Sequence, residues 1–596
     1  MTLLCIVVSR DGGALVLEGK ARCYTFSPIE SPCEQFRDAR EENGVGAVAS
    51  FVAELKRRRV VRAATVYTAV AFVLVQVADI AFPALHLPEW TLTFVVAMAI
   101  LGLPMTVGLA WVFDVTPHGL TRTPVTATTA QPAAAEVDEA SVAVLPFINI
   151  SPEPENEYFS DGLTEELLNM LAQVEGLRVP ARTSSFAFKG RNTDIRKIGE
   201  RLRVRTVLEG SVRKADERVM ITAQLINVAD GYHLWSGTYK RELKDIFTVQ
   251  EEIARAIVGT LRVRLLGGSS ARPTSQHTTD SASYTLYLKG RFFANRRSEN
   301  GFRKAIECFQ DAVARDPAYA LAYAGLADAY ALLSDYNLLP PKEGMPRAKE
   351  AALKALALDD SLAEAHTSLA MIRHDYDWDY TGSEREYLRA LELNPAYATA
   401  HHWYGEFLAL MGRFAEGIAR LEQAQQLDPL SLTVSADKGA AHYYARESEK
   451  AIAQLRKTLE LDSNFAPARH LLALAYAEKG LHSEARSQLE HALQIAPDTP
   501  RFIAALAHVH AAAGDMEQAR QALATLDRVA AASYVSPYDR AIGLAAVGDT
   551  TGAFAALNRA VDERIFQAVH LKVDPLLDDL RPDSRFVAVL RRLGLS

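Results

Sequence analysis

The C-terminal half of this chain repeats itself every 34 residues. Four successive units end on a similar dipeptide, and each dipeptide lies 34 residues after the last: Asn394-Pro395, Asp428-Pro429, Asp462-Ser463 and Ala496-Pro497. Proline disfavours helical geometry in the residue before it, so these dipeptides mark helix ends. Two-helix units of this length bury their apolar faces only by stacking on their neighbours. The sequence therefore predicts a mainly α-helical solenoid, with about eight units over residues 284–567 and a C-terminal cap over 568–596.

Small residues recur at fixed places in these units. Gly405 of one unit stands where Ala473 stands two periods later, and Gly417 corresponds in the same way to Ala485. A bulky side chain at these places would overpack the contact between helices. Further glycines are expected to make the turn inside a unit: Gly412, Gly480 and Gly514. The period, the small positions and the terminal proline together resemble the tetratricopeptide repeat, and the resemblance covers about half of the chain.

This resemblance implies a concave groove that binds an extended peptide or a partner helix. The positions that line the groove in this repeat family correspond in this chain to the following residues: His402, Glu406, Tyr443, Tyr444, His470, Glu478, Arg501 and His508. The chain is therefore expected to be a non-enzymatic scaffold that binds protein partners, without a cofactor. The sequence does not name those partners.

Residues 141–266 read as a separate, mixed α/β unit. A run of β-forming residues from Ser141 is stopped by Pro146, as for a buried strand. Alternating runs follow, and the last two are separated by Asp230-Gly231, a dipeptide typical of tight hairpins. Apolar residues at helical spacing over 246–265 close the unit with a helix. One linker is expected on each side of this unit: 118–140 before it and 267–283 after it.

Parts of this unit resemble the TolB amino-terminal-like domain, also called the FlgO-type domain. The stretches that carry the resemblance are 157–167, 207–213 and 230–235. Bacterial relatives often add an N-terminal winged helix, protein kinase or nucleotidyl cyclase, and many are labelled adenylate cyclase. Residues 1–50 are too few for such a module and are expected to be a disordered arm. The alternative function is therefore the sensory or regulatory part of a signalling system, either cyclase-like or a transcription regulator, whose output module is absent from this chain.

Residues 51–117 combine a basic flank with two apolar stretches. Lysine and arginine fill positions 56–59, residues 63–85 carry one charge, and residues 91–113 carry none. Each stretch is long enough to cross a hydrocarbon core of about 30 Å as a helix, and the basic flank disfavours a buried soluble hairpin. Residues 51–117 also resemble the membrane hairpin that precedes this domain in bacterial tetratricopeptide proteins, which implies two spans in the bacterial inner membrane. Flanking cations stay on the cytoplasmic side. The soluble parts would then be cytoplasmic, although relatives with a third span suggest the periplasm.

Other patterns indicate no metal, catalytic or nucleic-acid site. The four cysteines form no Cys-x-x-Cys pair, and a net charge of −8 disfavours binding to nucleic acid by bulk charge. His401 and His510 are expected to pack, whereas His402 and His508 face the groove. No two of these histidines have the spacing, with a partnering acid, of a helical zinc site.

An acidic stretch between residues 375 and 386 has the ligand spacing of a calcium-binding EF-hand loop. The sixth position of such a loop must be glycine for its sharp turn, and here it is Tyr380. The repeat register explains the same stretch as a helix end followed by a turn. We therefore expect no calcium site there.

Overall fold

The computed structural model describes residues 140–262, 278, 280–336 and 338–595, together with parts of the stretch 67–122. Residues 1–133 and 134–596 form two separate compact units. In the first unit, β1 (Phe113–Thr116) and β2 (Gly119–Arg122) pair as antiparallel strands. This pair begins at the end of the second expected span and runs into the expected linker.

Within the residues that the structure describes, no helix is both long and apolar enough to cross a membrane. Most residues of the two expected spans, and all of the expected N-terminal arm over residues 1–50, lie outside the described part of the chain. The membrane hairpin therefore stays a prediction.

The second unit begins with a small mixed sheet. Its strands are β3 (Val142–Val144), β4 (Ile148–Asn149), β5 (Thr206–Ala215), β6 (Arg218–Asn227) and β7 (His233–Glu242). Their order is β3-β5-β6-β7, and β4 also pairs with β5. The two short strands run parallel to β5, whereas β6 and β7 are antiparallel neighbours. At the predicted hairpin, Gly231 has a φ of +77°, a backbone conformation that favours glycine.

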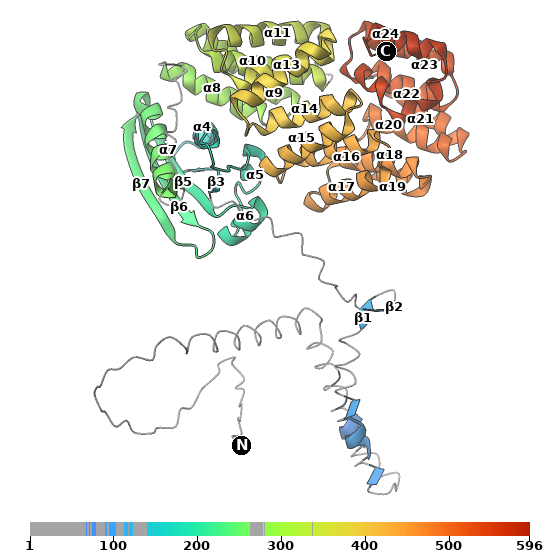
Figure 1. Ribbon diagram of the computed structural model, residues 1–596, viewed down its shortest axis with the longest axis horizontal. Helices are drawn as coiled ribbons and strands as arrows, with labels where there is room; N and C mark the ends of the chain where they lie inside the picture. Colours follow the sequence, from blue (N-terminus) through green and yellow to red (C-terminus); the bar gives the residue numbers. More distant parts are fainter. Residues whose placement is uncertain are drawn as a thin grey trace, which may run out of the picture. The chain divides into compact units, whose positions relative to one another are not determined.

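Four helices accompany this sheet: α4 (Glu157–Ala172), α5 (Arg182–Phe186), α6 (Ile195–Leu202) and α7 (Ile246–Arg262). β6 alternates between buried and partly exposed residues along most of its length. Its buried side chains, among them Ile221 and Leu225, share one core with Ile253 and Ile257 of α7 and with Leu163 and Leu167 of α4. The hydrophobic face of the sheet is therefore covered by these two helices (Figure 1).

In the described residues from 281 onward, sixteen helices follow as eight consecutive pairs. The pairs are α8 (Ser281–Ala294) with α9 (Glu299–Arg315), α10 (Ala320–Asp335) with α11 (Pro341–Leu358), α12 (Ala363–Ile372) with α13 (Tyr380–Leu393), α14 (Ala398–Leu410) with α15 (Phe414–Leu427), α16 (Leu432–Tyr444) with α17 (Ser448–Leu461), α18 (Ala466–Glu478) with α19 (His482–Ile495), α20 (Pro500–Ala512) with α21 (Met516–Ala530), and α22 (Pro537–Ala546) with α23 (Thr550–Asp562). They stack in chain order as a helical solenoid (Figure 1). The predicted fold class, a mainly α-helical repeat solenoid after a small α/β unit, is thus confirmed.

The predicted small positions are points of close contact. A Cβ atom added to Gly405 would lie 2.7 Å from Cγ of Leu421, and one added to Gly417 would lie 2.7 Å from the carbonyl oxygen of Gly405. Ala485 is fully buried in the corresponding place of a later unit. Because protein interiors are closely packed, these positions leave no room for a larger side chain.

Candidate partner-binding groove

The first helix of each pair lies on the inner side of the curved solenoid. From α10 to α22, the first helices of successive pairs contact one another, whereas each second helix contacts chiefly the first helices of its own pair and of the next. A curved stack brings its inner row closer together than its outer row. The eight predicted groove residues all belong to these first helices: α14, α16, α18 and α20.

The structure brings several of these residues into contact with inner-face partners. Nε2 of His402 lies 2.8 Å from a carboxylate oxygen of Asp437 and 3.6 Å from one of Glu406. The rings of His470 and Phe502 lie 5.3 Å apart, and Glu478 pairs with Arg446 at 3.5 Å. The predicted groove is therefore a network of polar and aromatic contacts that spans four repeats.

Tyr443 differs from its neighbour Tyr444. Tyr443 is 1% exposed and belongs to the hydrophobic core, so it does not line an open groove in this structure. Tyr444 reaches the inner face, where its hydroxyl lies 3.0 Å from Nδ1 of His570. One step along a helix rotates the side chain by about 100°, which separates a core position from a groove position.

The C-terminal end of the chain folds back onto the inner face. We call residues 564–580 the return segment; it includes η4 (Phe566–Lys572) and η5 (Pro575–Leu580), and α24 (Ser584–Arg592) follows it. Its His570 contacts Tyr444, its Asp578 pairs with Arg446 at 2.7 Å, and its Asp574 accepts a 2.8 Å hydrogen bond from Tyr538. His508 also lies near it, since the pKa of His508 is lowered by burial but raised in part by Asp579 and Asp578. The expected cap thus occupies part of the predicted groove.

The turns inside the repeats show how the chain accommodates this segment. Six turns, each 34 residues after the last, contain a residue with positive φ: Trp378, Gly412, Arg446, Gly480, Gly514 and Gly548. The three predicted turn glycines are among them. Such φ values disfavour residues with a side chain by roughly 1–2 kcal/mol. The two exceptions both contact the return segment: the guanidinium of Arg564 lies 4.2 Å from the Trp378 ring centroid, and Arg446 pairs with Asp578.

The α/β unit covers another part of the solenoid. Glu165 on α4 is almost fully buried, and it accepts hydrogen bonds from Arg182 of its own unit and from Arg291 and Asn295 of the solenoid. Burial opposes its ionisation, but Arg291 and Arg182 outweigh this and hold the pKa of Glu165 below its usual value. A second contact lies between α5 and the turn after α15, where Asp428 accepts hydrogen bonds from the backbone N–H and the hydroxyl of Ser184. Figure 1 shows α5 beside α15.

Between the part of the inner face near the α/β unit and the part covered by the return segment, the solenoid is rich in carboxylates. Burial, together with the charge of Asp375, raises the pKa of Asp335 to about 7. Burial and the charges of Asp437, Asp335 and Asp375 raise the pKa of Glu406 well above its usual value. Arg501 acts in the opposite direction on Asp335. Sequence reasoning found Glu406 and Arg501 but missed the three aspartates, because the repeat register gives them no shared position.

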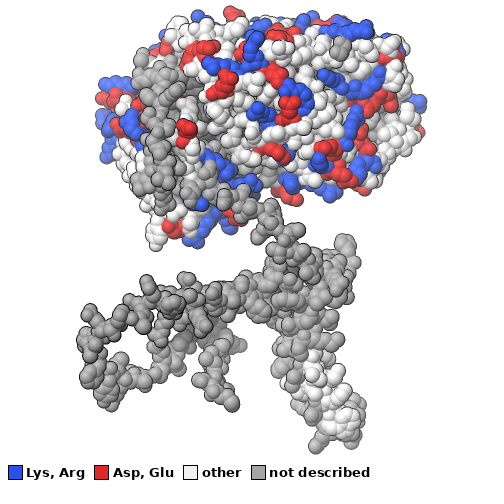
Figure 2. Space-filling view, viewed as in Figure 1, with Lys and Arg blue, Asp and Glu red and all other residues white. Residues whose placement is uncertain are grey.

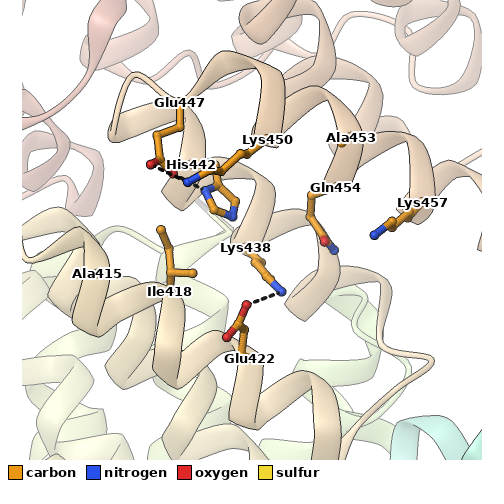
Figure 3. Close-up of a pocket in the computed structure, with 10 residues that line it drawn as sticks. All are labelled: Ala415, Ile418, Glu422, Lys438, His442, Glu447, Lys450, Ala453, Gln454 and Lys457. Atoms are coloured by element: carbon orange, nitrogen blue, oxygen red, sulfur yellow. Dashed lines mark hydrogen bonds and ion pairs between the residues drawn. The ribbon is translucent and has the colours of Figure 1, made fainter. Parts of the chain in front are cut away.

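The outer surface carries charges of both signs. Lysine and arginine side chains alternate with aspartate and glutamate over the face shown in Figure 2. A pocket of about 510 Å³ lies between α15, α16 and α17, away from the predicted groove residues (Figure 3). Most of its charged groups are paired with one another: Lys438 with Glu422 at 3.0 Å, and His442 and Lys450 with Glu447 at 2.7 and 2.8 Å. Lys457 lines it as well. The paired groups of the pocket therefore largely offset one another's charge.

The acidic stretch that resembles an EF-hand has a different structure. Residues Arg373–Asp377 form a short π-helix, η3, and α13 begins at Tyr380, so the residues form no twelve-residue loop. Asp377 pairs with Lys349 at 2.6 Å, whereas Glu386 pairs with His366 at 2.6 Å and with Arg373 at 3.3 Å. These carboxylates have separate partners and do not converge on one point.

Comparisons with known proteins agree with the repeat architecture. The family model described as tetratricopeptide repeat matches residues 478–536. A putative adenylate cyclase 3 of Rhizobium meliloti is 41% identical over 234 residues, which are 39% of this chain and 40% of that protein. The transcriptional regulator HilA of Salmonella typhimurium is 22% identical over 360 residues, or 60% of this chain and 63% of HilA. The chain thus spans less than two thirds of the length of either relative.

Among solved structures, PilF of Pseudomonas aeruginosa is 24% identical, covers 35% of this chain and 95% of its own, and superimposes with a TM-score of 0.29. The family match identifies residues 478–536 as tetratricopeptide repeat, and the helix pairs of the other units share its period and arrangement.

Proposed function

We propose that this chain is a membrane-anchored scaffold that binds a peptide segment of a protein partner on the inner face of its solenoid. The return segment is the observation that supports this most strongly. It consists largely of the short helices η4 and η5, and the inner face contacts it at Tyr444 and Arg446 while apolar side chains such as Leu571 are buried. A surface that binds one such segment has the chemistry to bind another.

The contacts of the return segment indicate what a competing partner would offer. Arg446 and Asp578 are 40% and 44% exposed, and ion pairs this exposed contribute about 0–1 kcal/mol. Exchange of this segment for a partner would therefore cost little at that contact. Since Arg446 pairs with Asp578 at this contact, the part of a partner segment that replaces Asp578 is expected to carry a carboxylate.

A photo-crosslinking amino acid tests this function in the full chain, expressed in a bacterial host together with its own neighbouring genes. Placed at Arg501 on α20, it should capture one discrete partner. Placed at Arg486, an exposed residue of a second helix, it should not. Asp578→Lys weakens the return segment and should raise the yield at position 501. Equal capture at both positions, or a lower yield in Asp578→Lys, would contradict a partner site on the inner face.

The membrane anchor and its topology belong to the same proposal. Two spans after a basic flank would keep the α/β unit and all repeats in the cytoplasm, at the bacterial inner membrane. A fluorescent reporter fused after residue 596 should fold and fluoresce, and alkaline phosphatase in the same place should be inactive. The reverse pattern would put the repeats in the periplasm.

A second candidate function is the regulatory part of a signalling system. The matches to a putative adenylate cyclase and to a transcriptional regulator favour it. In both candidates the chain itself is not the enzyme, and this assignment stays a prediction. Purified full-length chain is expected to make no cyclic AMP from ATP. Measurable conversion would replace the scaffold with a catalytic function.

A further inference from the structure

A histidine and two carboxylates from successive repeats meet on the inner face of the solenoid. His402 and Glu406 lie one turn apart on α14, and Asp437 lies on α16. One nitrogen or oxygen atom from each side chain lies within 4.8 Å of the other two. We propose that these three side chains bind a divalent transition-metal ion, and that Zn²⁺ fits them best.

The ligand chemistry and the distances agree with this metal. Imidazole nitrogen and carboxylate oxygen bind Zn²⁺ at about 2.0–2.2 Å, which places tetrahedral ligands roughly 3.3 Å apart. The 3.6 Å between His402 and Glu406 is near that value, whereas the 2.8 Å hydrogen-bond distance between His402 and Asp437 must lengthen slightly. The metal would replace the proton on Nε2 of His402. Three protein ligands leave a fourth position for water or for a carboxylate of a partner.

The surrounding charges supply a second, independent reason for a cation. Asp375 is 3% exposed, and its Oδ1 lies 2.8 Å from Nδ1 of His374 without the geometry of a hydrogen bond. Together with Asp335, Asp375 places further negative charge around Glu406. The cations Arg501 and Arg297 act on Asp335, whereas His402 lies next to the carboxylates of Glu406 and Asp437. A divalent ion neutralises both of its carboxylate ligands, which matters most where the protein restricts solvation.

Full-length chain without a histidine tag, in detergent and stripped with a chelator, tests this site directly. Zinc titration followed by metal analysis should give about one tightly bound ion per chain. His402→Gln, Glu406→Gln and Asp437→Asn should each weaken binding by about tenfold or more. His470→Gln and Glu478→Gln are matched controls on the neighbouring first helix α18, and they should bind as the wild type does.

Cobalt provides a spectroscopic readout that does not depend on stability. Co²⁺ at the site should give the intense visible absorption of a four-coordinate ion, and His402→Gln should abolish or shift it. Circular dichroism in chelator checks that each variant folds, and Glu406→Asp replaces Glu406→Gln if the latter does not. A wild type that binds no zinc, or controls that lose zinc as the three ligand variants do, would overturn the site.

Discussion

Two parts of the chain lie against the same solenoid, and they are held in different ways. The α/β unit is held by Glu165, whose side chain is 6% exposed and pairs with Arg182 and Arg291. The ion pair of the return segment, Arg446 with Asp578, is 40% and 44% exposed, and the segment also packs apolar side chains such as Val569 and Leu577 into the core. A buried charge that loses its partner costs several kcal/mol, whereas an exposed pair contributes about 0–1 kcal/mol.

This difference suggests separate roles for the two contacts. The α/β unit and the first repeats behave as one permanent body, because separation would leave buried charges unpaired. The ion pair of the return segment can open at small cost, whereas buried apolar side chains such as Val569, Leu571 and Leu577 keep the segment packed on the solenoid.

The largest expected effect comes from the buried contact. Glu165→Gln leaves Arg291 and Arg182 without a counter-charge and should lower the free energy of unfolding by about 3–5 kcal/mol. Urea unfolding followed by circular dichroism measures it. Glu157→Gln is the control on the same helix, since Glu157 is 50% exposed in its pair with Lys189 and should lose less than about 1 kcal/mol. Similar losses in both variants would show that the α/β unit is not held by its buried charge.

Overpacking the repeats should have the next largest effect. Gly405→Leu and Ala485→Leu force a side chain into helix contacts that have no free volume, and each should cost about 1–3 kcal/mol. Thermal melts of the full chain check this, with Ala453→Leu, which lines the outer pocket, as a control. If both core variants melt with the wild type, the repeat register is incorrect.

The melting temperature at different pH values tests the buried carboxylate Asp335, which lies on the inner face between the α/β unit and the return segment. The pKa of Asp335 is about 7 in the folded chain and near 3.8 when unfolded, so its contribution to stability is present below pH 4 and is lost as the pH rises to 7. Asp335→Asn should therefore raise the melting temperature at pH 8 in the presence of a chelator, and leave it unchanged at pH 4. Asp375 and Asp437 raise this pKa, whereas Arg501 and Arg297 lower it. A variant less stable than the wild type at pH 8 would mean that Asp335 is stabilised as a carboxylate.

The smallest change in melting temperature is expected for a substitution that weakens the contact of the return segment at Arg446. Arg446→Gly removes an exposed ion pair but also relieves a φ of +61°, so the two effects nearly cancel. Its melting temperature should stay close to that of the wild type, while limited proteolysis should cut the return segment faster. Gly480→Ala, in the same place of the next unit, should instead lower the melting temperature and leave that cleavage unchanged. Unchanged proteolysis in Arg446→Gly would show that Arg446 does not hold the segment.

The repeat period explains why the solenoid could be predicted from the sequence. Helix ends, small contact positions and turn glycines recur every 34 residues, so each repeat supports the interpretation of the others. The inner-face contacts have no such signal. Tyr444 and His570 are 126 residues apart, and His402 and Asp437 are 35 residues apart rather than one period. Sequence analysis therefore identified His402 as a groove residue but not the acid that it contacts.

Hydrogen–deuterium exchange on the full chain tests the difference between the two contacts most directly. Amides of α4 and α8 should exchange only through global unfolding, because the buried charges of Glu165 and Arg291 keep these helices together. Amides of the return segment should exchange faster than these, through local opening around the exposed pair of Arg446 and Asp578. Equally slow exchange in both regions would contradict the account, since the return segment would then be as permanent as the α/β unit.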